Sequence, residues 1–416
     1  MHDAVIVGAR CAGSAIARLL ARRGYRVLLI DRQTFPSDMT MSTHFIHQRG
    51  IGCLSRWGLR DQITATESHP VSRFKIDMGP FTLSGSAPPV DEERSGFAPR
   101  RLLLDEILVR AAVRSGAELR EGCRVETLLT EDGRVAGVKG VTPSGGVFSE
   151  KARIVVGADG PSSRVAAEVQ AAEYNSKPAL QGTAWIYWND VPLEAIELHL
   201  REYEAIYAFP SSDHSTLIGA NWSIDRFRTA RHDIETSYFD LLRRAAPELA
   251  ERVLQVKRAD ERIYLGSTRT FFRKACGPGW VLLGDAHYKK DPCTAQGITD
   301  AFCDAELLAD AIDHSLRGER DLSLALEDYE RDRVAWATPF YELTSQMATF
   351  APPTPEMLAI YTALQDNQED TDAFFGLITE AISPIQFFAP ENVERILKRG
   401  ASQGNECNSS APLASQ

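Results

Sequence analysis

The first thirty-one residues constrain the fold of this chain more than any other stretch. Residues 4–7 (Ala-Val-Ile-Val) form an unbroken apolar run, which predicts a parallel strand buried on both faces. A glycine turn from Gly8 to Gly13 follows, then apolar residues at helical spacing and a second apolar run at 27–30. Asp31 closes the unit. This order predicts the β-α-β unit of a Rossmann-like sheet.

Such a unit has the chemistry of a dinucleotide site. The free amides and dipole of a helix N-terminus favour a pyrophosphate, and a carboxylate about 20 residues later can accept a hydrogen bond from a ribose hydroxyl. Asp31 fits the second role. Arg10 departs from the pattern, because a glycine normally stands there to let the backbone approach the phosphates. A guanidinium can itself pair with phosphate. A purely structural turn is the alternative interpretation.

Composition excludes several classes of protein. A hydrophobic fraction of 44% and a charged fraction of 25% are typical of soluble globular domains. The net charge of −11 disfavours a nucleic-acid partner. The 7 cysteines contain no C-x-x-C pair, which predicts reduced thiols in a cytoplasmic protein without a metal site. No run approaches the roughly 18 apolar residues of a membrane span, so stable membrane insertion is not expected. A monomer and a homodimer both remain open.

Two later loops also follow buried strands. Residues 152–156 run directly into Gly157-Ala158-Asp159-Gly160, and residues 280–283 lead to Gly284-Asp285. A loop from Pro292 to Gly297 then enters a long predicted helix. In open α/β sheets, ligands bind at such carboxyl ends of parallel strands, and the helix start offers amide donors to an anion.

Other candidates lie in the loop after the first unit and at a later helix start. Residues 43–50 contain His44, His47 and Arg49, and Arg101 lies at the start of a later predicted helix. Arg49 is the stronger cofactor candidate of the first three, since phosphate and ribityl oxygens favour a fixed cationic donor. His44 and His47 are candidate catalytic bases, and a solvated loop is the alternative.

Strands dominate two further regions. Residues 124–129, 134–141 and 147–149 predict a three-stranded meander, separated by Asp-Gly and Gly-Gly turns. A hairpin at 72–96 and a strand-rich region at 176–272, with one helix at 234–254, predict a separate mixed sheet. Its aromatic residues could line a site for a flat apolar substrate, although core packing is the alternative. The candidates for substrate contact are Trp185, Tyr207, Phe209 and Trp222.

Taken together and in this order, the three loops resemble a family of FAD-dependent oxidoreductases. The family includes the p-hydroxybenzoate-hydroxylase-type monooxygenases, the geranylgeranyl-reductase-like enzymes and the flavin-dependent halogenases, and the resemblance covers roughly residues 3–340. It implies an α/β fold with a Rossmann-like FAD-binding domain carrying the β-meander, an interleaved mixed-sheet substrate domain and C-terminal helices. The implied FAD-binding domain comprises 1–71, 97–175 and 273–340, the substrate domain 72–96 and 176–272, the C-terminal helical segment 341–400, and a disordered tail 401–416.

The resemblance also implies the cofactors and their contacts. FAD would be the resident cofactor. There is no second dinucleotide domain, as is usual for this family, so NAD(P)H would be a transient electron donor or the electrons would come from a partner. Asp31 would hold the adenosine ribose, Asp285 the ribityl hydroxyls, and the amides of Gly297 and Ile298 the pyrimidine edge of the flavin. Asp159 belongs to a motif associated with both FAD and NAD(P)H. The full set of implied FAD contacts is Gly8, Arg10, Cys11, Ala12, Gly13, Asp31, Arg32, Arg49, Arg101, Val125, Asp159, Gly160, Asp285, Pro292, Gln296, Gly297 and Ile298.

Several reactions fit this family. We favour a monooxygenase that uses NAD(P)H and O₂ to oxygenate an aromatic or polyketide-like small molecule through a flavin C4a-hydroperoxide. A reductase of C=C bonds remains open. A halogenase is disfavoured, because the W-x-W-x-I-P signature appears only in a gapped form at 185–192 and its activating lysine would have to be Lys75 in an exposed hairpin. A flavin-binding redox sensor without turnover is the alternative from a different class.

Overall fold

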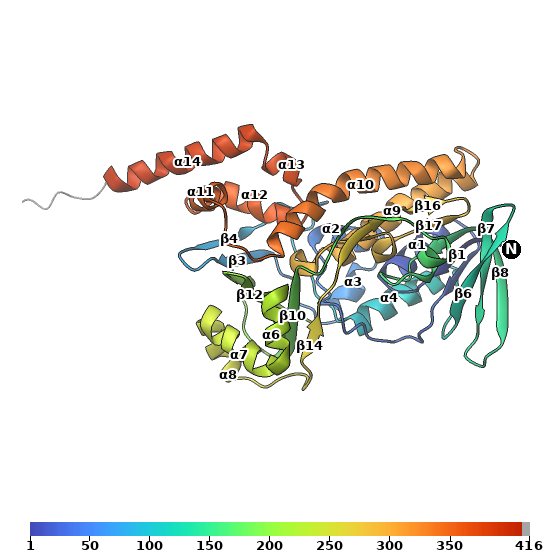
Figure 1. The fold of residues 1–416 in the computed structure, drawn as a ribbon, viewed down its shortest axis with the longest axis horizontal. Coiled ribbons are helices and arrows are strands. Elements are labelled where there is room, and N and C mark those ends of the chain that lie inside the picture. Colours follow the sequence, from blue (N-terminus) through green and yellow to red (C-terminus); the bar gives the residue numbers. More distant parts are fainter. Residues whose placement is uncertain (410–416) are drawn as a thin grey trace, which may run out of the picture.

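A computed structural model describes residues 1–409, and the side chains of residues 1–400. Its central sheet has the strand order β16-β17-β8-β1-β2-β5, with β6 and β7 joined to one end of β8. The central strand β1 pairs in parallel with β2 and β8, and β8 in turn pairs in parallel with β17 (Figure 1). These strands are β1 (His2–Val7), β2 (Val27–Ile30), β5 (Glu118–Arg120), β8 (Val147–Gly157), β16 (Cys276–Gly277) and β17 (Trp280–Leu282). The predicted Rossmann-like unit is confirmed.

Helices cover this sheet because their small apolar faces match its buried strands. Helix α1 (Cys11–Arg22) packs Ala15, Ile16 and Leu20 into the same cluster as the Ala4 and Ile6 side chains of β1. Two more helices, α4 (Arg101–Arg114) and α9 (Gly297–Leu316), pack against α1. The long helix α10 (Leu322–Met347) runs beside α9 (Figure 1).

The meander differs from the prediction in one respect. β6 (Arg124–Glu131) and β7 (Arg134–Val141) form the expected hairpin, but the predicted strands at 147–149 and 152–156 are a single strand, β8. Its first half pairs antiparallel with β7, and its second half pairs in parallel with β1. The sequence appeared to break because Glu150 and Lys151 lie on the half of β8 outside the core, where alternation with polar residues replaces the apolar run.

A second, seven-stranded sheet has the order β14-β10-β13-β12-β11-β3-β4. Helices α6 (Ile224–Ala230), α7 (Ile234–Ala245) and α8 (Pro247–Leu254) pack on one face. The predicted helix at 234–254 is therefore two helices, interrupted where Pro247 begins α8. The strands are β3 (Arg73–Asp77), β4 (Thr82–Ser86), β10 (Gln181–Asn189), β11 (Ile196–Arg201), β12 (Glu204–Pro210), β13 (Ser215–Ser223) and β14 (Tyr264–Gly266).

The remaining elements connect and cover these sheets. A small sheet contains β9 (Glu173–Lys177), β15 (Thr270–Arg273) and β18 (Tyr288–Lys289). The short helices are α2 (Gln48–Arg56), α3 (Arg60–Thr64) and α5 (Arg164–Glu168). The C-terminal segment folds into α11 (Pro355–Leu364), α12 (Gln368–Ile378), α13 (Pro384–Phe387) and α14 (Pro390–Ser409).

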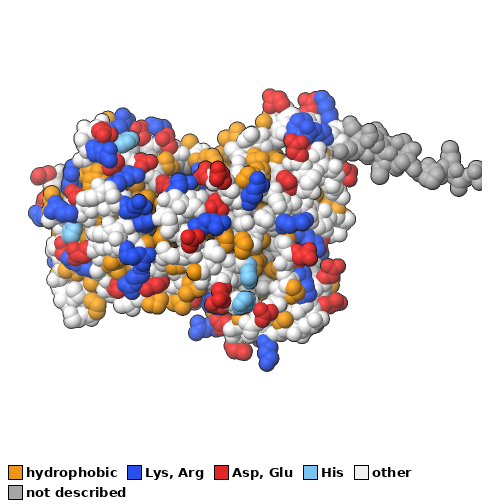
Figure 2. All heavy atoms as spheres, turned by 180° about the vertical axis from the view of Figure 1, so that it is seen from behind, with side chains coloured by type: hydrophobic (Ala, Val, Ile, Leu, Met, Phe, Trp, Pro, Cys, Tyr) orange, Lys and Arg blue, Asp and Glu red, His pale blue; other side chains and the backbone are white. Residues whose placement is uncertain are grey.

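The expected disordered tail covers residues 401–416. Helix α14 continues to Ser409, and residues 410–416 lie outside the described part of the chain. Within residues 1–409, none of the helices combines the length and the apolar character that crossing a bilayer requires. Acidic and basic side chains are interspersed over the face of the molecule shown in Figure 2.

Candidate functional site

The three glycine loops meet at the carboxyl ends of β1, β8 and β17. Gly8 has a φ of +98°, and a Cβ on it would lie 2.4 Å from the carbonyl oxygen of Ala158 in the loop after β8. A Cβ on Gly13 would lie only 1.7 Å from the carbonyl oxygen of Gly8. Gly284, after β17, faces Ala12, with 3.1 Å between its would-be Cβ and that of Ala12. The loops therefore form one continuous site, and these glycines are required for their close approach.

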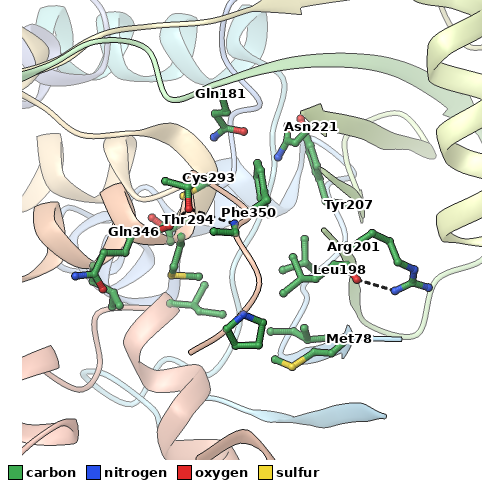
Figure 3. Close-up of a pocket in the computed structure, with 18 of the residues that line it drawn as sticks. Met78, Gln181, Leu198, Arg201, Tyr207, Asn221, Cys293, Thr294, Gln346 and Phe350 are labelled. Atoms are coloured by element: carbon green, nitrogen blue, oxygen red, sulfur yellow. Dashed lines mark hydrogen bonds between the residues drawn. The ribbon is translucent and has the colours of Figure 1, made fainter. Parts of the chain in front are cut away.

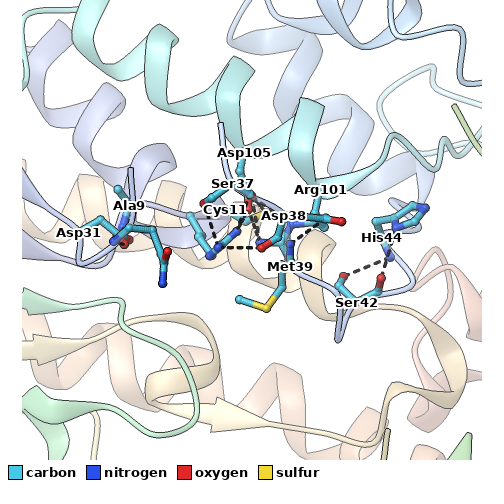
Figure 4. Close-up of polar contacts among 12 residues, drawn as sticks. Ala9, Cys11, Asp31, Ser37, Asp38, Met39, Ser42, His44, Arg101 and Asp105 are labelled. Atoms are coloured by element: carbon cyan, nitrogen blue, oxygen red, sulfur yellow. Dashed lines mark hydrogen bonds and ion pairs between the residues drawn. The ribbon is translucent and has the colours of Figure 1, made fainter. Parts of the chain in front are cut away.

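Asp31 is fixed against the glycine turn. Its Oδ2 accepts a hydrogen bond of 2.6 Å from the Ala9 amide, and its Oδ1 accepts one of 2.8 Å from the Gln33 amide (Figure 4). Two other predicted FAD contacts lie near this end of the sheet. The Arg32 side chain is exposed, and Val125 of β6 is buried in the cluster that contains Val5 and Val7. A carboxylate held at the end of β2, beside the turn after β1, has the placement that ribose binding requires.

Arg10 uses its charge within the protein. Its guanidinium donates to the Asp105 carboxylate at 2.5 Å, to both the carbonyl (3.2 Å) and the hydroxyl (3.1 Å) of Ser37, and to the Asp38 carbonyl (3.0 Å). Asp105 is fully buried and also accepts three hydrogen bonds from Arg101 and one from the Cys11 thiol (Figure 4). The pair of Arg10 and Asp105 therefore joins the glycine turn, the start of α4 and the loop at 37–38. Asp105 was not among the predicted site residues, although its spacing of four residues from Arg101 on a helix was a usable signal.

The carboxylates of the other two loops differ in availability. Asp159 accepts hydrogen bonds from the Ser163 hydroxyl (2.5 Å) and the Arg164 amide (2.6 Å), so it caps the turn leading to α5, and burial raises its pKa. Asp285 keeps 39% of its side chain exposed and lies 2.8 Å from the Lys289 ammonium. Of these two acids, Asp285 is the one open to a ligand.

The start of α9 also faces open space. No atom of the described residues lies within 4 Å of a Cβ built on Gly297, except its immediate chain and helix neighbours. The side-chain amide of Gln296 donates to the Ile378 carbonyl at 2.8 Å and to the Leu377 carbonyl at 3.3 Å. The first amides of α9, including those of Gly297 and Ile298, have no side-chain cap. Pro292 begins a short 3-10 turn, Pro292–Thr294, that positions this helix start. Uncapped amides before an open space suit a negatively polarised ligand edge.

The two histidines differ in the nitrogens they leave free. His44 Nε2 lies 2.9 Å from the Ser211 hydroxyl, and its Nδ1 lies 3.3 Å from the Ser42 carbonyl. His47 Nε2 lies 2.8 Å from the Thr294 carbonyl, whereas its Nδ1 has no partner among the described residues. Burial lowers the pKa of His44 to about 3 and the pKa of His47 to about 4, so both rings are neutral at pH 7.

Arg49 does not lie free in solution. Its guanidinium stacks over the Trp336 ring of α10, with 4.2 Å between the guanidinium carbon and the ring centroid. This cation–π contact fixes α2 against α10. Contact between Arg49 and a cofactor stays a prediction.

A cavity of about 740 Å³ lies between the second sheet, the loop 292–295 and the C-terminal helices (Figure 3). Tyr207 and Phe209 line it, as predicted for substrate contact. Trp185 is not among the lining residues and stacks on Tyr264 with 5.7 Å between ring centroids. Trp222 points to the opposite face of the sheet and packs in the cluster beneath α6–α8.

Strand alternation explains the position of Trp222. Its neighbour Asn221 points into the cavity instead, because successive side chains of a strand face opposite sides. The C-terminal segment contributes a wall of the cavity that was not predicted, and this wall includes Met347, Phe350 and Met357. No signal in the sequence links those residues to the second sheet.

Gly219 makes room for Tyr207 in this wall. A Cβ on Gly219 would lie 2.0 Å from the ring of Tyr207, on the paired strand. We expect Gly219→Ala to displace the ring, to lower the free energy of unfolding by about 1–3 kcal/mol and to change the shape of the cavity. Thermal unfolding and ligand binding check this. An unchanged melting temperature together with unchanged binding would show that Tyr207 does not occupy this position.

The residues fit an FAD molecule. The glycine cradle, Asp31 at the ribose position, the open Asp285 carboxylate and the uncapped start of α9 follow the order of the dinucleotide's parts along the sheet edge.

Comparison with known proteins agrees with this assignment. The chain is 25% identical over 367 residues to a tryptophan 2-halogenase of Chondromyces crocatus. The aligned region covers 83% of this chain and 69% of the relative. It is 24% identical over 341 residues to a digeranylgeranylglycerophospholipid reductase of Methanocella arvoryzae, covering 80% and 82%.

Solved structures share the whole fold. The flavin-dependent brominase Bmp2 has a TM-score of 0.79 at 17% identity, covering 98% of this chain and 99% of that one. PqsL, a probable FAD-dependent monooxygenase of Pseudomonas aeruginosa, has a TM-score of 0.71 at 20% identity, covering 90% and 99%. The family described as FAD binding domain matches residues 1–344. The chain belongs to this family and is an FAD-dependent oxidoreductase.

Proposed function

We propose that this protein is an FAD-dependent monooxygenase that uses NAD(P)H and O₂ to oxygenate an aromatic or polyketide-like small molecule. One oxygen atom enters the substrate, the other leaves as water, and NAD(P)H is oxidised. The observation that carries the proposal is the cavity: it borders the loop at 292–295 that precedes α9, its walls are mostly apolar, and no lysine lines it among the described residues.

FAD, when bound, supplies the activation of O₂ and the transfer of oxygen. The protein's residues then have three tasks. The apolar side chains of the second sheet exclude water from the reacting centre. The rings of Phe45, Tyr207 and Phe209 offer flat contact surfaces for an aromatic substrate. His47 presents an unpaired ring nitrogen that can accept a hydrogen bond from the substrate.

A halogenase is the main alternative, and Lys75 tests it. In β3, the flanking residues Phe74 and Ile76 line the cavity, so the Lys75 side chain lies on the other face of the strand. We therefore expect Lys75→Ala to retain turnover within about twofold of the unmodified protein, as is usual for surface substitutions. Steady-state oxidation of NAD(P)H measures it. A loss of turnover by orders of magnitude with FAD still bound would favour the lysine-dependent reaction.

The proposal is tested by mixing the FAD-loaded protein with NADH or NADPH in air and a panel of phenolic and polyketide-like compounds. We expect compound-stimulated oxidation of nicotinamide and a product heavier by one oxygen atom. A product heavier by two hydrogen atoms would instead indicate a reductase, and a halogenated product would indicate a halogenase. If neither NADH nor NADPH reduces the flavin, the protein is a redox sensor or receives its electrons from a partner.

A further inference from the structure

The cavity is chemically divided along its length. Polar side chains gather at the end beside the loop before α9, where Gln181, Asn221, Cys293 and Thr294 lie (Figure 3). The lining along β3 and β11 is mostly apolar, with Leu198 and Met78 toward the other end, where Arg201 also lies (Figure 3). A ligand that fills the whole cavity must therefore be amphipathic.

The polar end contains three buried atoms that lack a partner among the described residues: Gln181 Oε1, Thr294 Oγ1 and His47 Nδ1. All three side chains are at least nine-tenths buried and line the cavity. They are also held together, because the Gln181 amide and the Cys293 backbone amide both donate to the Asp291 carboxylate. Leaving buried polar atoms unpaired costs free energy, so a ligand group that pairs them is the natural explanation.

The hydrogen-bonding sense of these atoms identifies the ligand group. Gln181 already donates through its nitrogen, which leaves its carbonyl oxygen as an acceptor. A backbone carbonyl can only accept, so His47 donates to Thr294 through Nε2, and the Nδ1 of the neutral ring is also an acceptor. Two acceptors and one hydroxyl require a ligand that brings a donor, such as an O–H or N–H group.

Charge excludes an anionic group at this end. Among the described lining residues, the charged side chains are Arg201 and Glu202. Arg201 is already bonded to the Asp77 carboxylate at 2.9 Å and to three backbone carbonyls, and Glu202 is exposed. No described lining side chain offers an uncommitted cation to a carboxylate or phosphate.

We infer that the ligand is a neutral amphipath, with an O–H or N–H donor head at Gln181, Thr294 and His47 and an apolar chain along β3 and β11. This deepens the proposed function, since it names the substrate class of the same site. An electron-rich phenol or aromatic amine bearing an alkyl or prenyl chain has this chemistry.

Binding of matched probes to the FAD-loaded protein, measured by calorimetry without nicotinamide, tests the inference. The probes are phenol, 4-butylphenol, 4-hexylphenol and 4-hexylanisole. We expect affinity to rise about fourfold for each added methylene group. We expect about tenfold weaker binding of 4-hexylanisole than of 4-hexylphenol, because the ether leaves the acceptors unpaired. Equal affinity for these two probes would show that the ligand needs no donor group. If affinity does not depend on chain length, or if no probe binds, the chain does not lie along β3 and β11.

Leu198→Trp provides a check on the position of the chain, since it fills the apolar part without touching the polar end. We expect this variant to bind phenol as before and to lose the preference for 4-hexylphenol. Leu254→Trp, at a leucine that is 70% exposed on α8, is the matched control and should retain that preference. A Leu198→Trp protein with unchanged preference overturns the placement. If the probes bind as expected but are not oxygenated when nicotinamide and O₂ are added, the proposed function fails while this inference stands.

Discussion

Replacing Gly13 with alanine is expected to remove bound FAD, with affinity lowered by well over tenfold. The added methyl carbon would lie 1.7 Å from the Gly8 carbonyl oxygen, which belongs to backbone and cannot rotate away. The glycine turn must therefore open, and it would do so against Ala158 and Asp159, which Gly8 already touches closely. A displacement of this size costs several kcal/mol, and each 1.4 kcal/mol is about tenfold in affinity.

The ratio of flavin absorbance to protein absorbance after purification, and titration of FAD into the stripped protein, measure this effect. Gly146→Ala is the matched control. Gly146 lies in the hairpin turn between β7 and β8, at the opposite end of β8 from the Gly157–Gly160 loop, and a Cβ there would meet only the Thr142 hydroxyl at 3.2 Å. Circular dichroism distinguishes loss of FAD from loss of the fold. A Gly13→Ala protein that retains FAD at the unmodified level would refute the close packing of the turn.

The second large effect is expected from Lys290→Met, which should lower the free energy of unfolding by about 3–5 kcal/mol. The Lys290 ammonium lies 2.5 Å from the Glu380 carboxylate and 2.9 Å from the Asp300 carboxylate, and all three side chains are at most 8% exposed. Arg333 pairs with Asp300 and Asp304 on the other side of this cluster. Although burial alone would raise it, Lys290 and Arg333 hold the pKa of Asp300 below its usual value.

Removing the ammonium leaves a buried carboxylate without its cation, which is the costly way to break such a pair. The Lys290–Glu380 ion pair also ties the C-terminal segment to the FAD-binding domain, because Glu380 follows α12 and Lys290 precedes the loop at 292–295. Breaking the pair removes this link. Lys151→Met is the matched control: Lys151 pairs with Glu131 in the open, with both side chains more than half exposed, and should change stability by less than about 1 kcal/mol. Chemical denaturation measures both. Similar small effects in the two variants would show that the cluster is not buried as described.

The part of the fold that the sequence predicted is the part set by local pattern. The apolar run at 4–7, the glycine turn and Asp31 lie within one β-α-β unit, so their spacing alone indicated the structure. The order of three such loops then indicated the family. The positions of Gly8, Gly13 and Gly284 in one contact network agree with that prediction.

What the sequence could not show depends on partners distant in the chain. Arg10 meets Asp105 across 95 positions, and Lys290 meets Glu380 across 90. The face that Trp222 occupies depends on the register of β13, where a shift of one residue exchanges the two faces. The apolar end of the cavity needs the fold of the C-terminal segment, which brings Met347 and Phe350 opposite β11.

The most direct test of the account is the fate of oxygen in a reaction of the FAD-loaded protein with NADH or NADPH, 4-hexylphenol and ¹⁸O₂. The account predicts a product that carries a single ¹⁸O atom, with the second atom released as labelled water. A product that lacks the label, whether reduced or halogenated when chloride or bromide is supplied, would contradict it.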